Sequence, residues 1–260
     1  MGDTVCESGV RLVIFFAWGL MLGSFYHAWA WRMVREQSIA RGRSCCPMCG
    51  HELSMRELVP VLSWLWQKGC CRHCGGAIPA RYPLVELLTA LLFVSLAWRY
   101  TGVQLLSALV LGSLLLVLAL VDYDSWLIPD SLLLAGLLLY VPLQWLSGSL
   151  NVLTLGQAML QGCLVAVPLL LFVLAADAVL QKPSMGGGDI KLFFLLGVYL
   201  GAKMAMLTLF VSCLVGLLWQ LLWQRREQGG AFPFGPSIGL AAWIVLLWGE
   251  KMMRWYLLSL

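Results

Sequence analysis

Two aspartates in the apolar second half of the chain have surroundings that could support hydrolysis. Asp122 directly follows the apolar run LLLVLALV, and Asp189 follows three consecutive glycines, Gly186 to Gly188. Ionisable residues are costly in an apolar setting and are therefore candidates for function. Two carboxylates held close together share one proton, so that one can activate water while the other polarises a peptide carbonyl. This pattern favours aspartyl peptidase chemistry.

The same aspartates could instead be helix caps, and the residues alone leave this open. Asp130 follows Pro129 in a pattern typical of a helix N-terminus, so we assign Asp130 to capping. Asp122 and Asp124 could cap as well, and Asp189 could cap its own helix. A transporter that relays protons through carboxylates is a further alternative. The acidic residues gather near helix ends and not near the middle of an apolar run, which argues against a transporter.

Four cysteines have the spacing of a zinc ribbon. They form two C-x2-C pairs, Cys46 with Cys49 and Cys71 with Cys74, and 21 residues separate the pairs. Each C-x2-C turn presents two thiolates on one side, and two such turns complete a tetrahedron around zinc. A site closed by four thiolates leaves no position for water, so we expect a structural and not a catalytic metal.

Other roles for these cysteines remain open. Two disulfides are the alternative, which a reducing compartment would disfavour. Cys45 and Cys70 directly precede the pairs and could substitute for Cys46 and Cys71, but they give a poorer spacing. The nearby His51 and His73 are interpreted as supporting or solvated side chains and not as ligands.

The composition places these residues in a membrane protein. Hydrophobic residues make up 61% of the 260 residues and charged residues 12%, whereas a globular domain has roughly 25% charged residues. A soluble fold of this size could not hide so much apolar surface. Basic residues are not interleaved with stacking aromatics, so no nucleic-acid partner is expected. The first ten residues lack the basic region of a cleaved signal.

The apolar runs predict an all-α polytopic membrane protein with about eight transmembrane helices. Residues 201–203 are either a tight turn between two spans or a kink in one span, and in the latter case seven spans result. The eight expected spans are 10–31, 83–99, 103–121, 130–147, 154–180, 189–201, 203–223 and 237–258.

The basic residues predict which loops face the cytoplasm. Eleven Lys and Arg lie in the loops 32–82, 122–129, 181–188 and 224–236, against five on the other side. By the positive-inside rule the long polar loop, both aspartates and the cysteine pairs are cytoplasmic, and both termini lie outside. Three parts are expected: a first transmembrane helix at 1–31, a small zinc-ribbon-like cytoplasmic loop domain at 32–82, and a helical peptidase core at 83–260.

An ordered set of motifs resembles the type IV prepilin peptidase family of bifunctional leader peptidase/N-methyltransferases. Asp122 followed by Pro129-Asp130 is similar to the family's D-x6-P-D pattern, and Gly186 to Asp189 is similar to GxGD, with Lys191 following as in the family. The cysteine pairs also fall in the expected first loop. Four further segments resemble family motifs, namely Gly23-Ser24-Phe25, the stretches 59–65 and 81–89, and the PFGP-like segment 232–236.

The resemblance implies a site and a substrate. Asp122 and Asp189 would be the catalytic pair, with Asp124 in reserve for the first position and Gly186, Gly188 and Lys191 in the active-site loop. The substrates would be type IV prepilins or type II secretion pseudopilins, cut at the cytoplasmic face of the bacterial inner membrane. Many members then methylate the new N-terminus with S-adenosylmethionine. A different GxGD intramembrane protease and an inactive zinc-stapled docking protein are the alternatives.

The sequence departs from the family pattern at four positions. His27 stands where the family usually has Asn, and Met33-Val34 follows Arg32 where the family usually has Leu-Pro. Gly187, the middle residue of the GxGD motif, is often a larger residue in the family. These departures lie at the edge of the first loop and in the glycine run, and leave both aspartates in place.

Overall fold

The computed structural model describes residues 2–38, 43–182, 184–223 and 233–258. Within these ranges the chain is helical, and the only β-structure consists of two isolated bridges. The chain divides into two units, Met1–Tyr100 and Thr101–Leu260. The prediction of an all-helical protein is confirmed for the described part of the chain.

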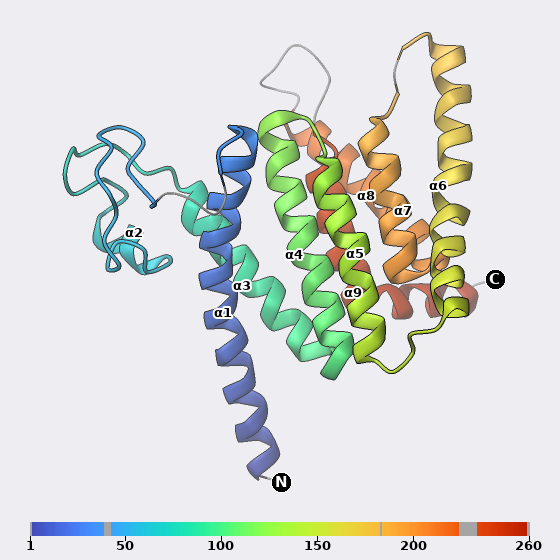
Figure 1. Ribbon diagram of the computed structural model, residues 1–260, viewed down its shortest axis with the longest axis horizontal. Coiled ribbons are helices and arrows are strands. Elements are labelled where there is room, and N and C mark those ends of the chain that lie inside the picture. Colours follow the sequence, from blue (N-terminus) through green and yellow to red (C-terminus); the bar gives the residue numbers. More distant parts are fainter. Residues whose placement is uncertain (1, 39–42, 183, 224–232, 259–260) are drawn as a thin grey trace. The chain divides into compact units, whose positions relative to one another are not determined.

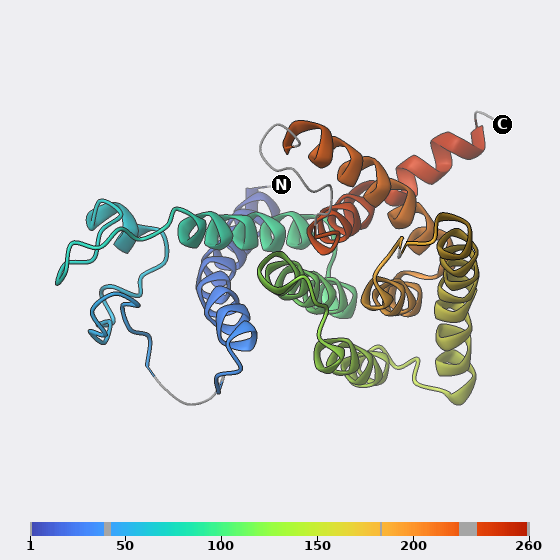
Figure 2. The same ribbon diagram turned by 90° about the horizontal axis from the view of Figure 1, so that it is seen from above.

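The first unit is built on two long helices that cross closely. Figures 1 and 2 show α1 (Gly2–Val34) and α3 (Arg81–Arg99) side by side. A Cβ added at Gly19 would lie 2.5 Å from the Cα of Ala90, and one added at Gly23 would lie 2.8 Å from the Cα of Glu86. Glycine therefore lets the two backbones approach, as is typical of helices packed in membranes. The loop between them carries the short helix α2 (Leu62–Trp66).

The second unit is a bundle of six helices among the described residues, and its core is aliphatic. The buried residues include Leu118 of α4, Leu192, Phe193 and Leu196 of α7, and Ile238 of α9. Contacts join α4 to α5 and α9, α7 to α5, α6 and α8, and α8 to α6 and α9. The helices are α4 (Gly102–Ser125), α5 (Asp130–Leu146), α6 (Val152–Leu180), α7 (Gly187–Leu200), α8 (Ala202–Trp223) and α9 (Gly235–Leu258).

Each of the eight expected spans corresponds to one helix. In the described residues, five helices are long and apolar enough to cross a membrane, namely α1 over Gly9–Val34, α3, α4, α6, and α8 over Ala202–Leu221. The helix α5 is apolar but shorter, α7 has 14 residues, and α9 carries three charged residues near its end. Five candidate spans are therefore shown, and eight crossings stay a prediction.

The residues around Gly201 form a tight turn and not a kink. Gly201 alone separates α7 from α8, has a φ of 79°, and donates its N–H to the carbonyl of Gly197. A positive φ is readily adopted only by glycine. One continuous helix does not run through this point, and the choice between seven and eight spans stays a prediction.

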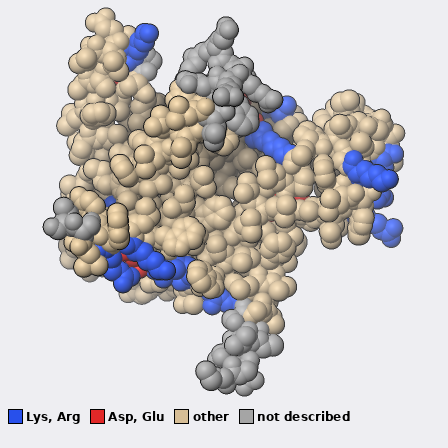
Figure 3. Space-filling model, turned by 180° about the vertical axis from the view of Figure 1, so that it is seen from behind, with Lys and Arg blue, Asp and Glu red and all other residues tan. Residues whose placement is uncertain are grey.

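The outer surface is largely uncharged. Large apolar side chains such as Phe172, Val179 and Phe210 are more than half exposed. In Figure 3 the visible face is mostly without Lys, Arg, Asp or Glu, which gather in a few small groups. Such a surface suits lipid as solvent.

The contacts divide the chain differently from the expected parts. The helix α3 belongs with α1 in the first unit, whereas the sequence patterns place residues after 82 in the peptidase core. The reason is the close crossing at Gly19 and Gly23, which composition does not reveal. The expected division at residues 31 and 82 stays a prediction.

Candidate functional site

The second unit brings Asp122 and Asp189 together. Asp122 lies in the last turn of α4 and is 6% exposed, while Asp189 lies partly buried in the first turn of α7. The two carboxyl groups are close enough that the charge of one acts on the other. Two residues that are 67 positions apart thus form one electrostatic site, as the dyad hypothesis requires.

At the end of α4, Asp122 and Asp124 lie in different surroundings. Trp126 ends the helix in the left-handed conformation, with a φ of 59°, and donates its N–H to the carbonyl of Asp122. Two helical positions apart, Asp122 and Asp124 point to opposite sides of α4. Asp122 is buried and Asp124 is exposed, so the structure places Asp122 against Asp189.

A third element completes the surroundings of the pair. The N–H of Gly235, the first residue of α9, donates a hydrogen bond of 2.8 Å to Oδ2 of Asp122. Gly235 belongs to the PFGP-like segment, whose first residue, Phe232, lies outside the described residues. The sequence carried a signal here, a glycine before a proline at a helix start, but nothing local connected it to Asp122.

The glycines before Asp189 differ in what they touch. A Cβ added at Gly188 would lie 2.8 Å from Cβ of Ile128, which belongs to the loop between α4 and α5. A Cβ at Gly186 would lie 3.1 Å from Oδ2 of Asp189, whereas one at Gly187 would meet nothing within 4 Å. Gly188 therefore lets α7 approach the Asp122 loop, and the middle position has room for a side chain.

Lys191 forms an ion pair outside the aspartate pair. Its Nζ lies 2.7 and 2.8 Å from the two carboxylate oxygens of Asp130, and both side chains are mainly exposed.

The prediction that Asp130 is the N-cap of a helix is wrong by one position. Pro129 is the N-cap of α5 without a side-chain cap bond, and Asp130 is the first helical residue. Asp189 does not cap α7 either, because Gly186 is its N-cap.

In the first unit the four predicted cysteines form one cluster. The Sγ atoms of Cys46, Cys49, Cys71 and Cys74 all lie within 4.8 Å of one another, and those of Cys46 and Cys74 are 3.9 Å apart. Four thiolates around zinc have sulfur atoms about 3.8 Å apart, given zinc–sulfur bonds of about 2.3 Å. The donor set and its spacing therefore fit a tetrahedral metal ion.

Two matching turns build this cluster. The N–H of Cys46 donates to the carbonyl of His51, and Gly50, with a φ of 72°, donates to Cys46. The second pair repeats the pattern, with Cys71 bonded to Gly76 and Gly75 bonded to Cys71. Each turn therefore aims two sulfur atoms to the same side.

The residues flanking the turns are not part of the sulfur cluster. Cys45 and Cys70 bridge to Glu52 and Ala77 through their backbones and are exposed. The cysteines that the structure describes are free of disulfide bonds. His51 and His73 stack on each other with ring centroids 3.4 Å apart, near Glu57.

The thiols of the cluster differ in their acidity. Backbone N–H groups of Cys49 and Met48 lower the pKa of Cys46 to about 7. For Cys74 the N–H of Gly76 also acts to lower the pKa, but burial and the three neighbouring sulfur atoms together raise it to about 11. The cluster cannot hold four negative charges without a cation between them.

Comparisons with known proteins agree with this geometry. A family model described as type IV leader peptidase family matches residues 109–221, and one described as bacterial peptidase A24 N-terminal domain matches residues 17–100. No solved structure gives a significant match.

Several curated relatives cover most of the chain. A prepilin leader peptidase/N-methyltransferase of Bacillus subtilis (strain 168) is 36% identical over 95% of this chain and 98% of its own length. The proteins of the same name from Aeromonas salmonicida (strain A449) and Pseudomonas aeruginosa are 42% and 37% identical, over 83% and 82% of this chain and 74% of each relative. On this evidence the chain belongs to the type IV leader peptidase family.

Proposed function

We propose that this protein is an aspartyl endopeptidase that removes the leader from prepilins or pseudopilins at the membrane surface. The observation that carries the proposal is the pairing of Asp122 with Asp189 at the adjoining ends of α4 and α7. Membership of the leader peptidase family supports the same chemistry.

The two carboxyl groups would share one proton and act in different roles. The hydrogen bond from Gly235 and the positive end of α9 favour the negative charge on Asp122, which leaves the proton on Asp189. Asp122 then takes a proton from water as the water oxygen bonds to the scissile carbonyl carbon. Asp189 donates its hydrogen bond to the carbonyl oxygen. When the C–N bond breaks, the amine nitrogen takes up a proton from the pair.

The substrate would lie at the interface between lipid and water. A prepilin has a basic leader followed by an apolar helix, so the leader stays in water while the helix lies in the bilayer. The scissile bond then reaches the interface, where the helix ends carry both aspartates. We further propose that this side is cytoplasmic, since the basic residues gather in the loops on it.

Two further activities of the family belong to this proposal. The four-cysteine cluster would hold a structural zinc ion, which would fix the loop between α1 and α3. The protein would also methylate the new N-terminus of its product with S-adenosylmethionine, and this part of the proposal is supported by the word N-methyltransferase in the names of the relatives.

Cleavage of a prepilin in isolated membranes tests the proposal. Wild type is compared with Asp122→Asn and Asp189→Asn, and with Asp124→Asn as the control on the exposed side of α4. Each dyad variant should lose about 1,000-fold or more in rate, and the control should keep most of it. Cleavage that persists in both dyad variants excludes the aspartyl mechanism. Loss of cleavage in the control alone would assign the first position to Asp124.

A further inference from the structure

The loop between α1 and α3 brings together a second group of side chains that can bind a metal, separate from the four cysteines. His51, His73 and Glu57 each offer one ligand atom, and these atoms all lie within 4.8 Å of one another. The two imidazole rings lie against each other, with centroids 3.4 Å apart. Because the three residues come from three separate segments of the loop, only its folded shape brings them together.

The turns that present the cysteines also hold both histidines. His51 follows the first turn, and its backbone carbonyl accepts the N–H of Cys46. His73 lies inside the second turn, which is closed by the hydrogen bond from the N–H of Gly75 to the carbonyl of Cys71. A metal ion in the four-cysteine cluster would fix both turns and would thereby fix the backbone that carries both rings.

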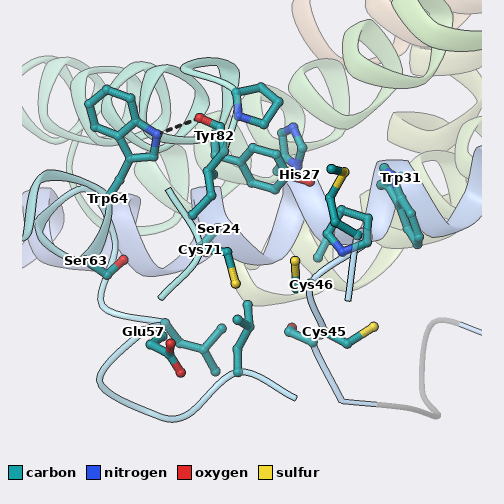
Figure 4. A pocket seen from close by; sticks show the side chains of 18 of the residues that line it. Ser24, His27, Trp31, Cys45, Cys46, Glu57, Ser63, Trp64, Cys71 and Tyr82 are labelled. Atoms are coloured by element: carbon teal, nitrogen blue, oxygen red, sulfur yellow. Dashed lines mark hydrogen bonds between the residues drawn. The ribbon is translucent and has the colours of Figure 1, made fainter. Parts of the chain in front are cut away.

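A third turn orients the carboxylate. The N–H and the hydroxyl of Ser54 both donate to Oε2 of Glu57, over 2.9 and 2.7 Å. In the part of the chain that the structure describes, Oε1 of Glu57 accepts no hydrogen bond. Glu57 also lines a cavity of about 460 Å³ between α1, this loop and α3, as Figure 4 shows. The carboxylate therefore has open space beside it and an oxygen that is available as a ligand.

The donor set selects an ion that prefers imidazole. Two histidines and a glutamate are a known set of protein ligands for zinc, whereas calcium and magnesium prefer oxygen ligands. Donor atoms in a tetrahedron around zinc are about 3.4 Å apart, given zinc–nitrogen bonds of about 2.0–2.1 Å. A small rotation of the three side chains, whose ligand atoms already lie within 4.8 Å of one another, would reach this spacing.

The neighbouring cysteine cluster would strengthen the attraction for a second cation. A zinc ion held by four thiolates keeps a net negative charge, because its own charge is smaller than that of its ligands. His51 is two residues from Cys49, and His73 is directly before Cys74. Both imidazoles thus lie near that negative charge, and a cation bound between them would reduce it.

We propose that His51, His73 and Glu57 bind a second divalent ion of the class that prefers imidazole, represented here by zinc. The ion is distinct from the one in the cysteine cluster, which four sulfur atoms already complete. Three ligands leave a fourth position open for water, and His73 is exposed, so this ion exchanges with the solvent. When bound, it ties the turn at residues 54–57 to both cysteine turns.

Equilibrium dialysis of the full-length protein against zinc in detergent micelles tests the proposal. Wild type should take up a second ion when zinc is added, beyond the one that the cysteines hold. The variants His51→Gln, His73→Gln and Glu57→Gln each remove one ligand. Each should weaken the second ion at least about 100-fold, since losing a residue that only supports a ligand already costs about 10–100-fold.

The first ion provides the control for folding in the same experiment. It should stay bound in all three ligand variants, because their cysteines and cysteine turns are intact. Glu52→Gln and Arg72→Gln change exposed side chains next to the two histidines in the sequence and should bind both ions as wild type does.

Cobalt(II) as a probe distinguishes the two ions by their ligands. Cobalt bound to thiolates absorbs strongly through charge transfer from sulfur, whereas cobalt bound to nitrogen and oxygen does not. The first equivalent should therefore raise this absorption, and the second should bind without raising it further. Growth of the sulfur band through the second equivalent would overturn the inference, because it would assign the second ion to exposed thiols such as Cys45 and Cys70.

Two other results would overturn the inference. One is a single zinc ion bound by wild type over the whole range of added zinc. The other is a second ion that wild type and all three ligand variants bind equally well. Neither readout involves prepilin, so the failure of this inference and the failure of the peptidase proposal are told apart.

Discussion

The backbone N–H of Gly235 donates a hydrogen bond of 2.8 Å to Oδ2 of Asp122, although the two residues are 113 positions apart. The bond joins the first residue of α9 to the last turn of α4. N–H groups in the first turn of a helix lack partners within the helix, and the helix dipole there attracts negative charge. The bond therefore both orients Asp122 and favours its ionised form over that of its partner.

A methyl group at this position should disturb the aspartate pair. A Cβ at residue 235 would lie 2.7 Å from Oδ2 of Asp122, so Gly235→Ala must displace the carboxylate or the start of α9. Because a small misplacement of a reacting group can cost about 100-fold, we expect prepilin cleavage to fall by about 10–100-fold. The measurement is the initial rate in membranes. Gly239→Ala on the same helix is the control, since its Cβ would keep an ordinary 3.6 Å from the carbonyl oxygen of Leu115. Equal rates for both variants would contradict the role of Gly235.

Alanine substitutions at the neighbouring glycines 187 and 188 should have opposite effects on prepilin cleavage. Gly187→Ala meets open space and replaces a helical glycine, so cleavage should persist and stability should rise by up to about 1 kcal/mol. Gly188→Ala would place a Cβ 2.8 Å from that of Ile128 and should separate α7 from the Asp122 loop. We expect cleavage to fall at least about tenfold. Rates and thermal midpoints of the two variants, measured side by side, decide this, and a loss at 187 with none at 188 would refute it.

Much of the fold could be predicted because hydrophobic patterning is a local property. Each expected span falls on a helix, for instance 130–147 on α5 and 154–180 on α6, with ends that differ by a few residues. The cysteine spacing also predicted the cluster, since each C-x2-C turn is a local structure that needs only a glycine after it.

The missing parts depend on contacts between distant residues. Nothing near Gly235 in the sequence indicates that its N–H meets Asp122, and nothing near Lys191 indicates its ion pair with Asp130, 61 positions away. Glu86 lies in the stretch 81–89, which resembles a family motif and begins a span, but nothing in that stretch indicates that its carboxylate lines a cavity. Single-sequence reasoning thus predicted the acidic pair, but not the groups that contact it.

The crossing of α6 and α7 depends on two glycines. A Cβ at Gly197 would lie 2.7 Å from the Cα of Gly162, and backbone atoms cannot yield as a flexible side chain can. Gly197→Ala should therefore lower the free energy of unfolding by about 1–3 kcal/mol, as overpacking usually does. Gly156→Ala on α6 is the control, because a Cβ there would meet nothing within 4 Å. Thermal unfolding in detergent micelles measures both, and equal midpoints would contradict a close crossing.

Substitution of a cluster cysteine should reduce the bound metal, whereas substitution of the cysteine directly before it should not. Cys46→Ser and Cys71→Ser each remove a sulfur from the cluster and should lower bound zinc from about one ion per chain to a small fraction, because a tetrahedral site needs all four ligands. Cys45→Ser and Cys70→Ser change exposed thiols one position away and should keep the metal. Metal analysis of the purified full-length protein measures this, with iron counted as well since four thiolates also bind iron.

Loss of the metal should also destabilise the loop between α1 and α3. Because a metal ion stabilises a small loop that has little hydrophobic core, removing the ion with a chelator should lower the thermal midpoint, as should Cys46→Ser, while Cys45→Ser should keep the midpoint of wild type. A loss of zinc in Cys45→Ser equal to that in Cys46→Ser would show that the ligand set is misassigned. Zinc loss without any change in the thermal midpoint would contradict a structural role for the metal.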